Sequence, residues 1–222
     1  MSNKNTIRRI LIDIQDLIND PIENCYIKFI DEDVNKIYVL IVGTENTPYD
    51  GGFYLFQVNF TTRYPFEPPK VKFLSTYEKV RFHPNLYEDG KVCLSILGTW
   101  SGPQWTSVMN LRFIVLTLQC LFCENPVTNE PGFETELTTS VRNINYNKLI
   151  TFYNWKYSIM DTLEKLNEHI FHQEIRDFYN KNYETYKRKL NNLKMTSKVE
   201  MVKAMYSMKY MVDYSSIEII CP

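Results

Sequence analysis

A proline-rich segment, Arg63 to Pro69, limits the folds that this chain can adopt. Its three prolines lack the backbone donors that a central strand needs, so the segment is expected to form a turn. Apolar and polar residues alternate directly before this segment, a pattern typical of a half-buried strand. The apolar face of that strand carries Tyr54, Phe56, Val58 and Phe60. A short strand over residues 71–74 is expected after the turn, so the segment joins two strands.

Two further strands are expected earlier in the chain, over residues 25–30 and 37–42, with a turn at residues 31–33 between them. A helix is expected before them, ending at Asn19-Asp20-Pro21. Its apolar residues recur at helical spacing and are Ile7, Ile10, Leu11, Ile14, Leu17 and Ile18. A helix followed by a four-stranded antiparallel meander predicts an α+β fold with one face of the sheet covered.

Helices are also expected after the meander. A central amphipathic helix is predicted with Thr106 or Ser107 as its N-cap. Two more helices are predicted around residues 149–166 and 175–190, and the methionines at 201, 205, 208 and 211 recur at helical spacing. We therefore expect a core domain over residues 1–135 and a C-terminal helical extension over residues 136–222, packed on the core or attached to it.

Composition excludes several classes of function. The 222 residues carry a net charge of −1, which argues against a nucleic-acid binder that relies on a basic face. The N-terminus has no apolar signal core, and no apolar run is long enough to span a bilayer. Five cysteines, an odd number spread along the chain, do not form a disulfide framework. These features predict an intracellular protein, cytoplasmic or nuclear and not secreted, with reduced thiols.

The stretch from residue 83 to residue 94 contains two expected reversals of the chain. His83-Pro84-Asn85 is a rigid turn, because proline fixes its own φ and favours an extended conformation in the residue before it. The Asp89-Gly90 pair forms the second reversal, since glycine tolerates a positive φ. The chain is thus expected to double back on itself.

This reversal is expected to bring the side chain of Asn85 close to the sulfur of Cys93, in a shallow surface groove. An amide donor beside a thiolate suits acyl transfer, in which sulfur carries the acyl group and the amide stabilises the oxyanion. A cysteine between Val92 and Leu94 is also typical of a buried apolar position, so the chemical interpretation needs further support.

That support is a resemblance. His83-Pro84-Asn85, the glycine that follows the polar loop and the interval from Asn85 to Cys93-Leu94 resemble the active-site segment of ubiquitin-conjugating enzymes. Residues 47–52, Thr-Pro-Tyr-Asp-Gly-Gly, and residues 64–70, Tyr-Pro-Phe-Glu-Pro-Pro-Lys, are similar to two other signature stretches of the family. Three ordered motifs at compatible intervals are more specific than one, and the resemblance covers approximately residues 4–135.

The resemblance implies roles for several residues. Cys93 would accept ubiquitin, or a ubiquitin-like protein, as a thioester, with Asn85 stabilising the oxyanion and His83 supporting the turn rather than acting as a base. Glu130 is the candidate acid that orients the incoming lysine, and Asn129 is the alternative. For either residue, capping a following helix is a structural alternative.

The resemblance also implies partners. Arg8 and Arg9 are candidates for contact with the activating enzyme, and Phe66, Ser107 and Val108 lie where ligases dock. Alternatively, Phe66 has a structural role, in which its ring packs within the turn onto a neighbouring proline. The enzyme itself would need no metal or organic cofactor, because ATP is used upstream by the activating enzyme. Protein substrates would be partners, with no nucleic acid or membrane.

The sequence departs from the family pattern in several places. Thr44 follows Gly43 where the family usually has proline, and extra residues occur around residues 75–79. Ser107 and Val108 replace a proline and a small residue that normally help to dock RING-type ligases. The Leu97–Trp100 insertion and the segment 124–134 resemble the subgroup that contains the conjugating domain of giant inhibitor-of-apoptosis proteins.

Three alternatives remain open from the sequence. The Cys120-x-x-Cys123 pair, with His169 and His172, has ligand types that zinc accepts, although a core or groove position is the commoner use of such a pair. A non-catalytic adaptor with a conjugating-enzyme fold would bind ubiquitin or another partner without chemistry, but such relatives typically lack the cysteine. A cysteine hydrolase would use His83 as the base for Cys93.

Overall fold

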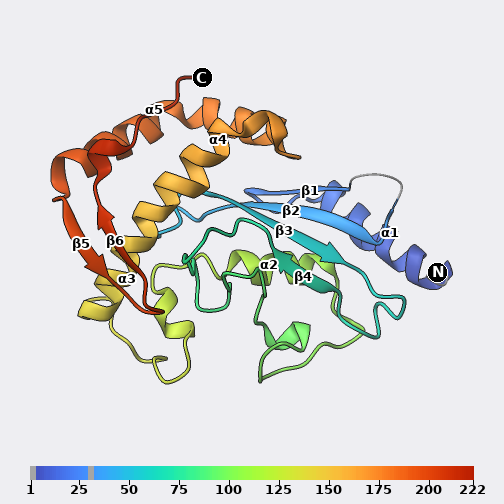
Figure 1. Cartoon of the computed structure of the whole chain (residues 1–222). Helices are drawn as coiled ribbons and strands as arrows, with labels where there is room; N and C mark the ends of the chain where they lie inside the picture. Colours follow the sequence, from blue (N-terminus) through green and yellow to red (C-terminus); the bar gives the residue numbers. More distant parts are fainter. Residues whose placement is uncertain (1–3, 30–32) are drawn as a thin grey trace. The chain divides into compact units, whose positions relative to one another are not determined.

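The structure, a computed structural model, describes residues 4–29 and 33–222 (Figure 1). Within these residues the chain forms two compact units. The first unit contains the chain up to Ile41 together with Tyr54–Thr76 and Asn85–Leu121, and the second contains Val42–Phe53, Tyr77–Pro84 and Phe122–Pro222. The second unit therefore combines the chain from Phe122 onward with two short segments from earlier in the predicted core domain. Compactness does not test whether a segment folds alone, so the domain boundary at residue 135 stays a prediction.

The first unit is built on the predicted antiparallel meander. Its elements are α1 (Lys4–Asn19), β1 (Cys25–Lys28), β2 (Lys36–Val42), β3 (Phe53–Asn59), β4 (Lys70–Phe73) and α2 (Leu111–Gln119). The sheet order is β1-β2-β3-β4, with Cys25 opposite Ile41 and Phe56 opposite Phe73. The α+β prediction with four consecutive strands is confirmed, although β1 ends at Lys28, and residues 30–32 of the expected strand and turn lie outside the described residues.

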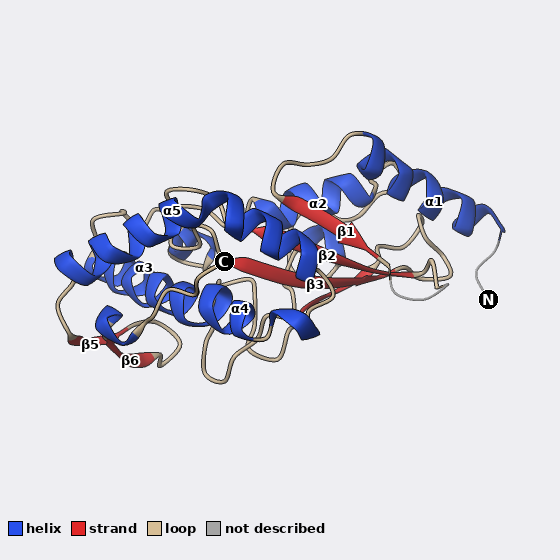
Figure 2. Ribbon diagram, turned by 90° about the horizontal axis from the view of Figure 1, so that it is seen from above, coloured by secondary structure: helices blue, strands red, loops and turns tan. Residues whose placement is uncertain are grey.

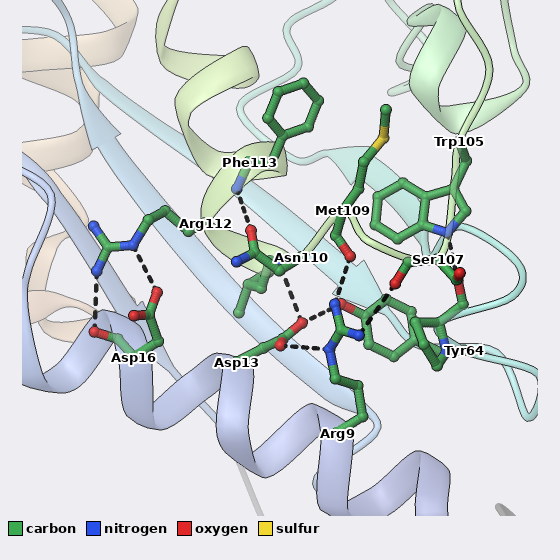
Figure 3. Close-up of polar contacts among 12 residues, drawn as sticks. Arg9, Asp13, Asp16, Tyr64, Trp105, Ser107, Met109, Asn110, Arg112 and Phe113 are labelled. Atoms are coloured by element: carbon green, nitrogen blue, oxygen red, sulfur yellow. Dashed lines mark hydrogen bonds and ion pairs between the residues drawn. The ribbon is translucent and has the colours of Figure 1, made fainter.

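Helix α1 buries a narrower apolar face than the sequence predicts. Ile10, Ile14 and Leu17 are buried, whereas Leu11 and Ile18 are half exposed. The buried face also contains a carboxylate, Asp13, which lies outside the predicted apolar stripe. Three donors satisfy that carboxylate, which is why it tolerates burial. They are Arg9 Nε at 2.8 Å, the backbone N–H of Leu111 at 3.1 Å and the hydroxyl of Tyr64 (Figure 3).

The start of α2 corrects the predicted N-cap. Thr106 and Ser107 lie in a turn in which Met109 N donates to Thr106 O at 3.0 Å. Asn110 caps the helix instead, since its Oδ1 accepts from Phe113 N at 3.0 Å (Figure 3). Asparagine is as good an N-cap as serine, and it lies next to the first apolar residue of the helix.

The second unit contains the C-terminal helices. Its helical elements include α3 (Val141–Tyr153), a π-helix (Asn154–Asp161), the short α4 (Thr162–Glu164) and the long α5 (His172–Thr196) (Figure 1). Short 3₁₀ turns in the chain are Ser95–Leu97, Pro126–Asn129, Leu166–Glu168 and Tyr214–Ser216. Both predicted helical segments are confirmed, and Ser140 caps the first by accepting from Asn143 N at 3.1 Å.

The helical spacing of the four methionines does not correspond to a helix. Residues 200–212 form a separate two-stranded sheet, in which β5 (Glu200–Lys203) pairs with β6 (Lys209–Val212) (Figure 2). Tyr206 and Ser207 form the turn with φ near 60°, the left-handed region that tight hairpins use. Met201 faces Met211 across the ladder, so a spacing that resembles helical periodicity arises from cross-strand pairing.

The C-terminal helices hold the loop from Gly43 to Gly52 inside the second unit. The Tyr186 hydroxyl of α5 donates to Gly51 O at 2.6 Å, and Lys189 Nζ lies 2.7 Å from Asp50 Oδ2. The side-chain amide of Asn154 donates to Asp50 O at 2.9 Å. One of the three signature stretches is therefore fastened by residues from the C-terminal region.

Candidate active site

The segment from Asn85 to Cys93 is a tight antiparallel hairpin in the first unit. Cys93 N donates to Asn85 O at 2.9 Å, and Leu86 is bridged to Val92. At the closed end, Tyr87 N donates to the Lys91 carbonyl oxygen at 2.9 Å. The predicted reversal is confirmed, and it places Asn85 directly opposite Cys93.

Gly90 closes this hairpin at a position that only glycine fills without strain. Its φ is 87°, and its carbonyl oxygen accepts from Phe73 N at 2.8 Å, which joins the hairpin to the end of β4. A Cβ atom at Gly90 would lie 2.5 Å from Phe73 O. Positive φ and close backbone approach both favour glycine.

The Asn85 carboxamide points to the backbone of Cys93. Asn85 Nδ2 donates to Cys93 O at 2.6 Å, and the asparagine side chain is itself buried. The amide nitrogen therefore lies beside the backbone of Cys93, where it binds the carbonyl oxygen and holds the hairpin closed. Its predicted proximity to the sulfur stays a prediction.

Cys93 itself is buried, with 1% of its surface exposed. The expectation of a sulfur in a shallow surface groove is therefore wrong. A thiol buried to this degree is not accessible to a large reaction partner without local rearrangement of the chain around it. Such burial is also typical of a structural cysteine.

The Leu97–Trp100 insertion includes a residue that the sequence analysis missed. Thr99 Oγ1 accepts from Leu94 N at 2.9 Å and donates to Val92 O at 2.7 Å. This hydroxyl thus fixes the backbone on both sides of Cys93. Gly98, with φ 68°, ends the short 3₁₀ turn just before it, and a glycine-threonine pair after a short apolar turn is the only sequence signal for this contact.

His83 lies in the second unit and is fully buried. Burial, with a smaller contribution from the charge of Arg81, lowers the pKa of His83 to about 3. The imidazole is therefore neutral at physiological pH. Its aromatic neighbour Tyr49, 6.2 Å away between ring centroids, donates its hydroxyl to Phe82 O at 2.7 Å.

Glu130 and Asn129 also belong to the second unit, and neither caps a following helix. Glu130 ends the 3₁₀ turn Pro126–Asn129, and the next helix begins at Val141 with its own serine cap. Glu130 Oε2 accepts the Tyr206 hydroxyl at 2.6 Å. Asn129 Nδ2 contacts Pro126 O at 3.4 Å, so the two candidates have different environments.

The candidate partner-binding residues lie in the first unit. Phe66 is 77% exposed and Val108 is 85% exposed, and Ser107 and Arg8 are also on the surface. Their loops are fastened together, because Trp105 Nε1 donates to Pro65 O at 2.7 Å (Figure 3).

Arg9 has a structural use in the same region. Besides pairing with Asp13, its guanidinium donates to Met109 O at 2.6 Å and Ser107 O at 3.2 Å (Figure 3). Any contact of Arg9 with a partner would use a side chain that is already engaged in holding α1 to the turn before α2.

All five cysteines are free thiols. Cys120 is exposed and Cys123 is partly exposed, and in the described part of the chain no group of three or more His, Cys, Asp or Glu side chains is arranged to hold a metal. Burial raises the pKa of Cys25 to about 12. None of the described helices is both long and apolar enough to cross a membrane.

Comparison with known protein families assigns the chain to one of them. The family model described as "Ubiquitin-conjugating enzyme" matches residues 9–154, about two thirds of the chain. The chain is a member of the ubiquitin-conjugating enzyme family. The match includes the hairpin of Cys93 and Asn85 as well as the loop at Glu130.

Named relatives agree with this family. The chain is 40% identical over 164 residues to ubiquitin-conjugating enzyme E2 Z of Danio rerio, covering 73% of this chain and 50% of that protein. It is 41% identical over 157 residues to E2 Z of Homo sapiens, covering 70% of this chain and 44% of that protein. The solved structure of human E2 G1 is 28% identical, covers 54% of this chain and 94% of its own, and has a TM-score of 0.47. The chain spans about half the length of the E2 Z relatives.

Proposed function

We propose that this protein is an active ubiquitin-conjugating enzyme that carries ubiquitin, or a ubiquitin-like protein, as a thioester on Cys93. The single observation that supports this most is the family match over residues 9–154, which includes a hairpin that sets a cysteine opposite a buried carboxamide donor. The proposed activity is transfer of the modifier from an activating enzyme to lysine amines of protein substrates.

The proposed chemistry has two acyl transfers. In the first, the Cys93 thiolate attacks the thioester carbonyl carbon of the charged activating enzyme, a new C–S bond forms, and the activating enzyme's thiolate leaves. In the second, a lysine nitrogen attacks the same carbon, a C–N bond forms, the C–S bond breaks, and Cys93 leaves as thiolate while the amine loses a proton. Both steps develop an oxyanion, which an amide donor stabilises.

Asn85 is the proposed donor in the second transfer. Its Nδ2 is 2.6 Å from Cys93 O, so it is held at the reacting residue but is occupied. Release of that hydrogen bond would free the amide for the oxyanion. The rearrangement that exposes the sulfur and the one that frees the amide involve the same backbone, so we propose that they occur together.

His83 is proposed to support the turn and not to take a proton. A neutral imidazole with a pKa of about 3 is a poor base, and full burial gives it no access to solvent. This weighs against the cysteine hydrolase alternative. Release of a fluorogenic ubiquitin amide in the absence of an activating enzyme would revive it.

A thioester assay tests the proposal. The full chain is incubated with activating enzyme, ATP and ubiquitin, and a product that is lost on reduction is expected. Cys93→Ala should abolish the product, and Cys120→Ala is the matched control because that thiol is exposed but outside the hairpin. A product that survives Cys93→Ala would contradict the assignment of the thioester to Cys93. No product across a panel of activating enzymes and modifiers would contradict the proposal and favour the non-catalytic adaptor.

The finer assignments are parts of this proposal. Placement in the subgroup with the conjugating domain of giant inhibitor-of-apoptosis proteins is supported by the Leu97–Trp100 insertion. Partners would be an activating enzyme at α1, through Arg8 or Arg9, and a ligase at the exposed residues Phe66, Ser107 and Val108. We propose an intracellular location, cytoplasmic or nuclear, and a reaction that needs no cofactor of its own, since ATP is used by the activating enzyme.

A further inference from the structure

The tip of the β5–β6 hairpin contacts the candidate lysine-orienting residue. Tyr206, at the turn of this hairpin, donates its hydroxyl to Glu130 Oε2 at 2.6 Å, across 76 residues of sequence. The contact is partly buried, and a hydrogen bond to a carboxylate in such surroundings is stronger than one between neutral groups. One oxygen of Glu130 is thereby fixed by the C-terminal region.

The ring of Tyr206 has two neighbours besides the contact of its hydroxyl with Glu130. The guanidinium carbon of Arg81 lies 4.1 Å from the centre of the Tyr206 ring, within the range of a cation–π interaction. The ring of Tyr146 lies 6.2 Å away and nearly perpendicular to it. With φ at 59°, the Tyr206 backbone is also in a conformation that the turn imposes. The ring therefore has little freedom to turn away from Glu130.

Arg81 extends the same cluster to the turn that precedes Asn85. Arg81 Nη2 donates to Pro84 O at 2.5 Å, and Arg81 N lies 3.4 Å from Met208 Sδ of the hairpin. The hydroxyl of Tyr146 donates to Arg81 O at 3.0 Å. The hairpin tip is thus bonded to two segments at once, the loop of Glu130 and the segment that leads into His83-Pro84.

From these contacts we propose that Tyr206 is a positioning residue for the transfer of the modifier to lysine, acting by orienting the Glu130 carboxylate. This inference rests on the proposed role of Glu130 toward the incoming lysine. The tyrosine hydroxyl occupies one carboxylate oxygen, Oε2, and so fixes the orientation of the carboxylate that would bind the ammonium group of lysine. The C-terminal hairpin would then be part of the transfer machinery and not only of the fold.

The chemistry predicts which nucleophile depends on this contact. A lysine approaches as a cation that must be oriented and must lose a proton before its nitrogen attacks the thioester. Hydroxylamine is already neutral near pH 7 and small, so its attack on the same carbon needs no carboxylate. Removing the Tyr206 hydroxyl should therefore slow discharge to lysine and leave discharge to hydroxylamine unchanged.

Tyr206→Phe is the variant of choice, because it removes the hydroxyl and keeps the ring that stacks on Arg81. The matched control is Tyr210→Phe on the same hairpin, whose hydroxyl accepts a hydrogen bond from Lys156 instead. The wild type and both variants are charged on Cys93, the activating enzyme is stopped, and single-turnover discharge is followed with free lysine and with hydroxylamine. Tyr206→Phe is expected to slow the lysine reaction about tenfold, and Tyr210→Phe is expected to match the wild type.

A double-mutant cycle completes the test. If Tyr206 acts through Glu130, the Tyr206→Phe change should have no further effect on lysine discharge in a Glu130→Ala background. Additive effects, equal slowing of both nucleophiles, or wild-type discharge to lysine by Tyr206→Phe would each overturn the inference. A wild-type protein that never forms the thioester would overturn the proposed function as well, whereas normal charging with unchanged lysine discharge would overturn this inference alone.

Discussion

Asn85 and Cys93 are joined twice across one hairpin: Cys93 N donates to Asn85 O at 2.9 Å, and Asn85 Nδ2 donates to Cys93 O at 2.6 Å. The second bond satisfies a backbone carbonyl at a residue that is almost completely buried. Asn85 therefore has a structural use in the uncharged protein, besides the oxyanion role that we propose in transfer. The two uses predict different measurable effects.

Asn85→Ala is expected to charge normally and to discharge to lysine about 10²-fold more slowly, since loss of one oxyanion donor has an effect of that size. The variant should also be less stable by about 1–2 kcal/mol, because a buried carbonyl loses its partner. Single-turnover discharge and chemical denaturation measure the two effects separately.

Asn143→Ala is the matched control for this variant. Asn143 is also a buried asparagine whose Nδ2 donates to a backbone carbonyl, that of Thr138 at 3.1 Å. It should lose similar stability and retain normal discharge. If both variants discharge equally slowly, the effect at Asn85 is due to stability and the oxyanion role is contradicted.

Burial of Cys93 predicts how the thiols react with a small alkylating reagent in the native protein. Cys120 is exposed and should be labelled first, whereas Cys93 should wait for local opening. Cys25 should react slowest, because a pKa of about 12 leaves only about one thiolate in 10⁴ at pH 8. Mass spectrometry of digested samples over time gives the three rates. Labelling of Cys93 as fast as Cys120 would show that opening is not needed.

Gly90→Ala is expected to destabilise the hairpin by about 3 kcal/mol or more, through a left-handed φ and a Cβ that meets the Phe73 carbonyl oxygen at 2.5 Å. Gly98→Ala separates the two causes, since Gly98 also has a positive φ but nothing lies within 4 Å of its added Cβ. That control should lose only about 1–2 kcal/mol. Equal losses in urea denaturation would mean that the close approach is relieved at little cost.

The buried imidazole of His83 predicts acid sensitivity. Its pKa is lowered to about 3 in the folded protein, while the unfolded value is near 6.5, so below pH 6.5 the unfolded state binds more protons. The contribution of this imidazole to the free energy of unfolding should therefore be complete above pH 6.5. It should fall by up to about 1.4 kcal/mol per pH unit as the pH drops from 6.5 toward 3.

His83→Gln should flatten this part of the stability curve, since glutamine does not gain the proton. His172→Gln is the control, because His172 lies on the surface of α5 and has no burial to lose. Denaturation at a series of pH values between 4 and 7 provides the slopes. An unchanged slope in His83→Gln would assign the acid sensitivity to other groups.

The meander and the hairpin of Cys93 were predictable from sequence, because each depends on local signals. Alternation in β3, prolines after it and glycine at residue 90 act over a few residues. The alternation of buried and exposed residues then fixes which face of each strand is buried. These features do not require knowledge of distant contacts.

The errors have a common cause in contacts between residues far apart in the chain. Asp13 lies outside the predicted apolar stripe of α1 and charged side chains are rarely buried, whereas the partners that allow its burial, Tyr64 and Leu111, are 51 and 98 residues away. The contact of Tyr206 with Glu130 has no local sequence signal either, because it depends on the β5–β6 hairpin, and the methionines of that hairpin recur at helical spacing. The burial of Cys93 likewise depends on residues that pack around it in the folded chain, so the local sequence does not predict it.

A further prediction concerns how α5 holds the loop from Gly43 to Gly52. The Tyr186 hydroxyl donates to Gly51 O at 2.6 Å. Gly51 has φ 69°, and a Cβ atom added to it would lie 2.9 Å from the same tyrosine ring. Tyr186→Phe removes the hydroxyl without changing the buried ring, so it should cost about 1 kcal/mol of stability. The freed loop should also exchange its amide hydrogens faster at residues 43–52, which hydrogen-exchange mass spectrometry resolves.

Tyr183→Phe, one turn earlier on α5, is the matched control. Its hydroxyl lies 3.7 Å from the sulfur of Cys221 and does not contact the loop, so exchange at residues 43–52 should match the wild type. Removing the chain after residue 150 is the stronger version of the same test, because Phe53 then loses the ring of Phe178, 6.1 Å away, and apolar surface of the second unit is exposed. A truncated protein that stays soluble, charges normally and protects residues 43–52 would show that the loop does not depend on the C-terminal helices.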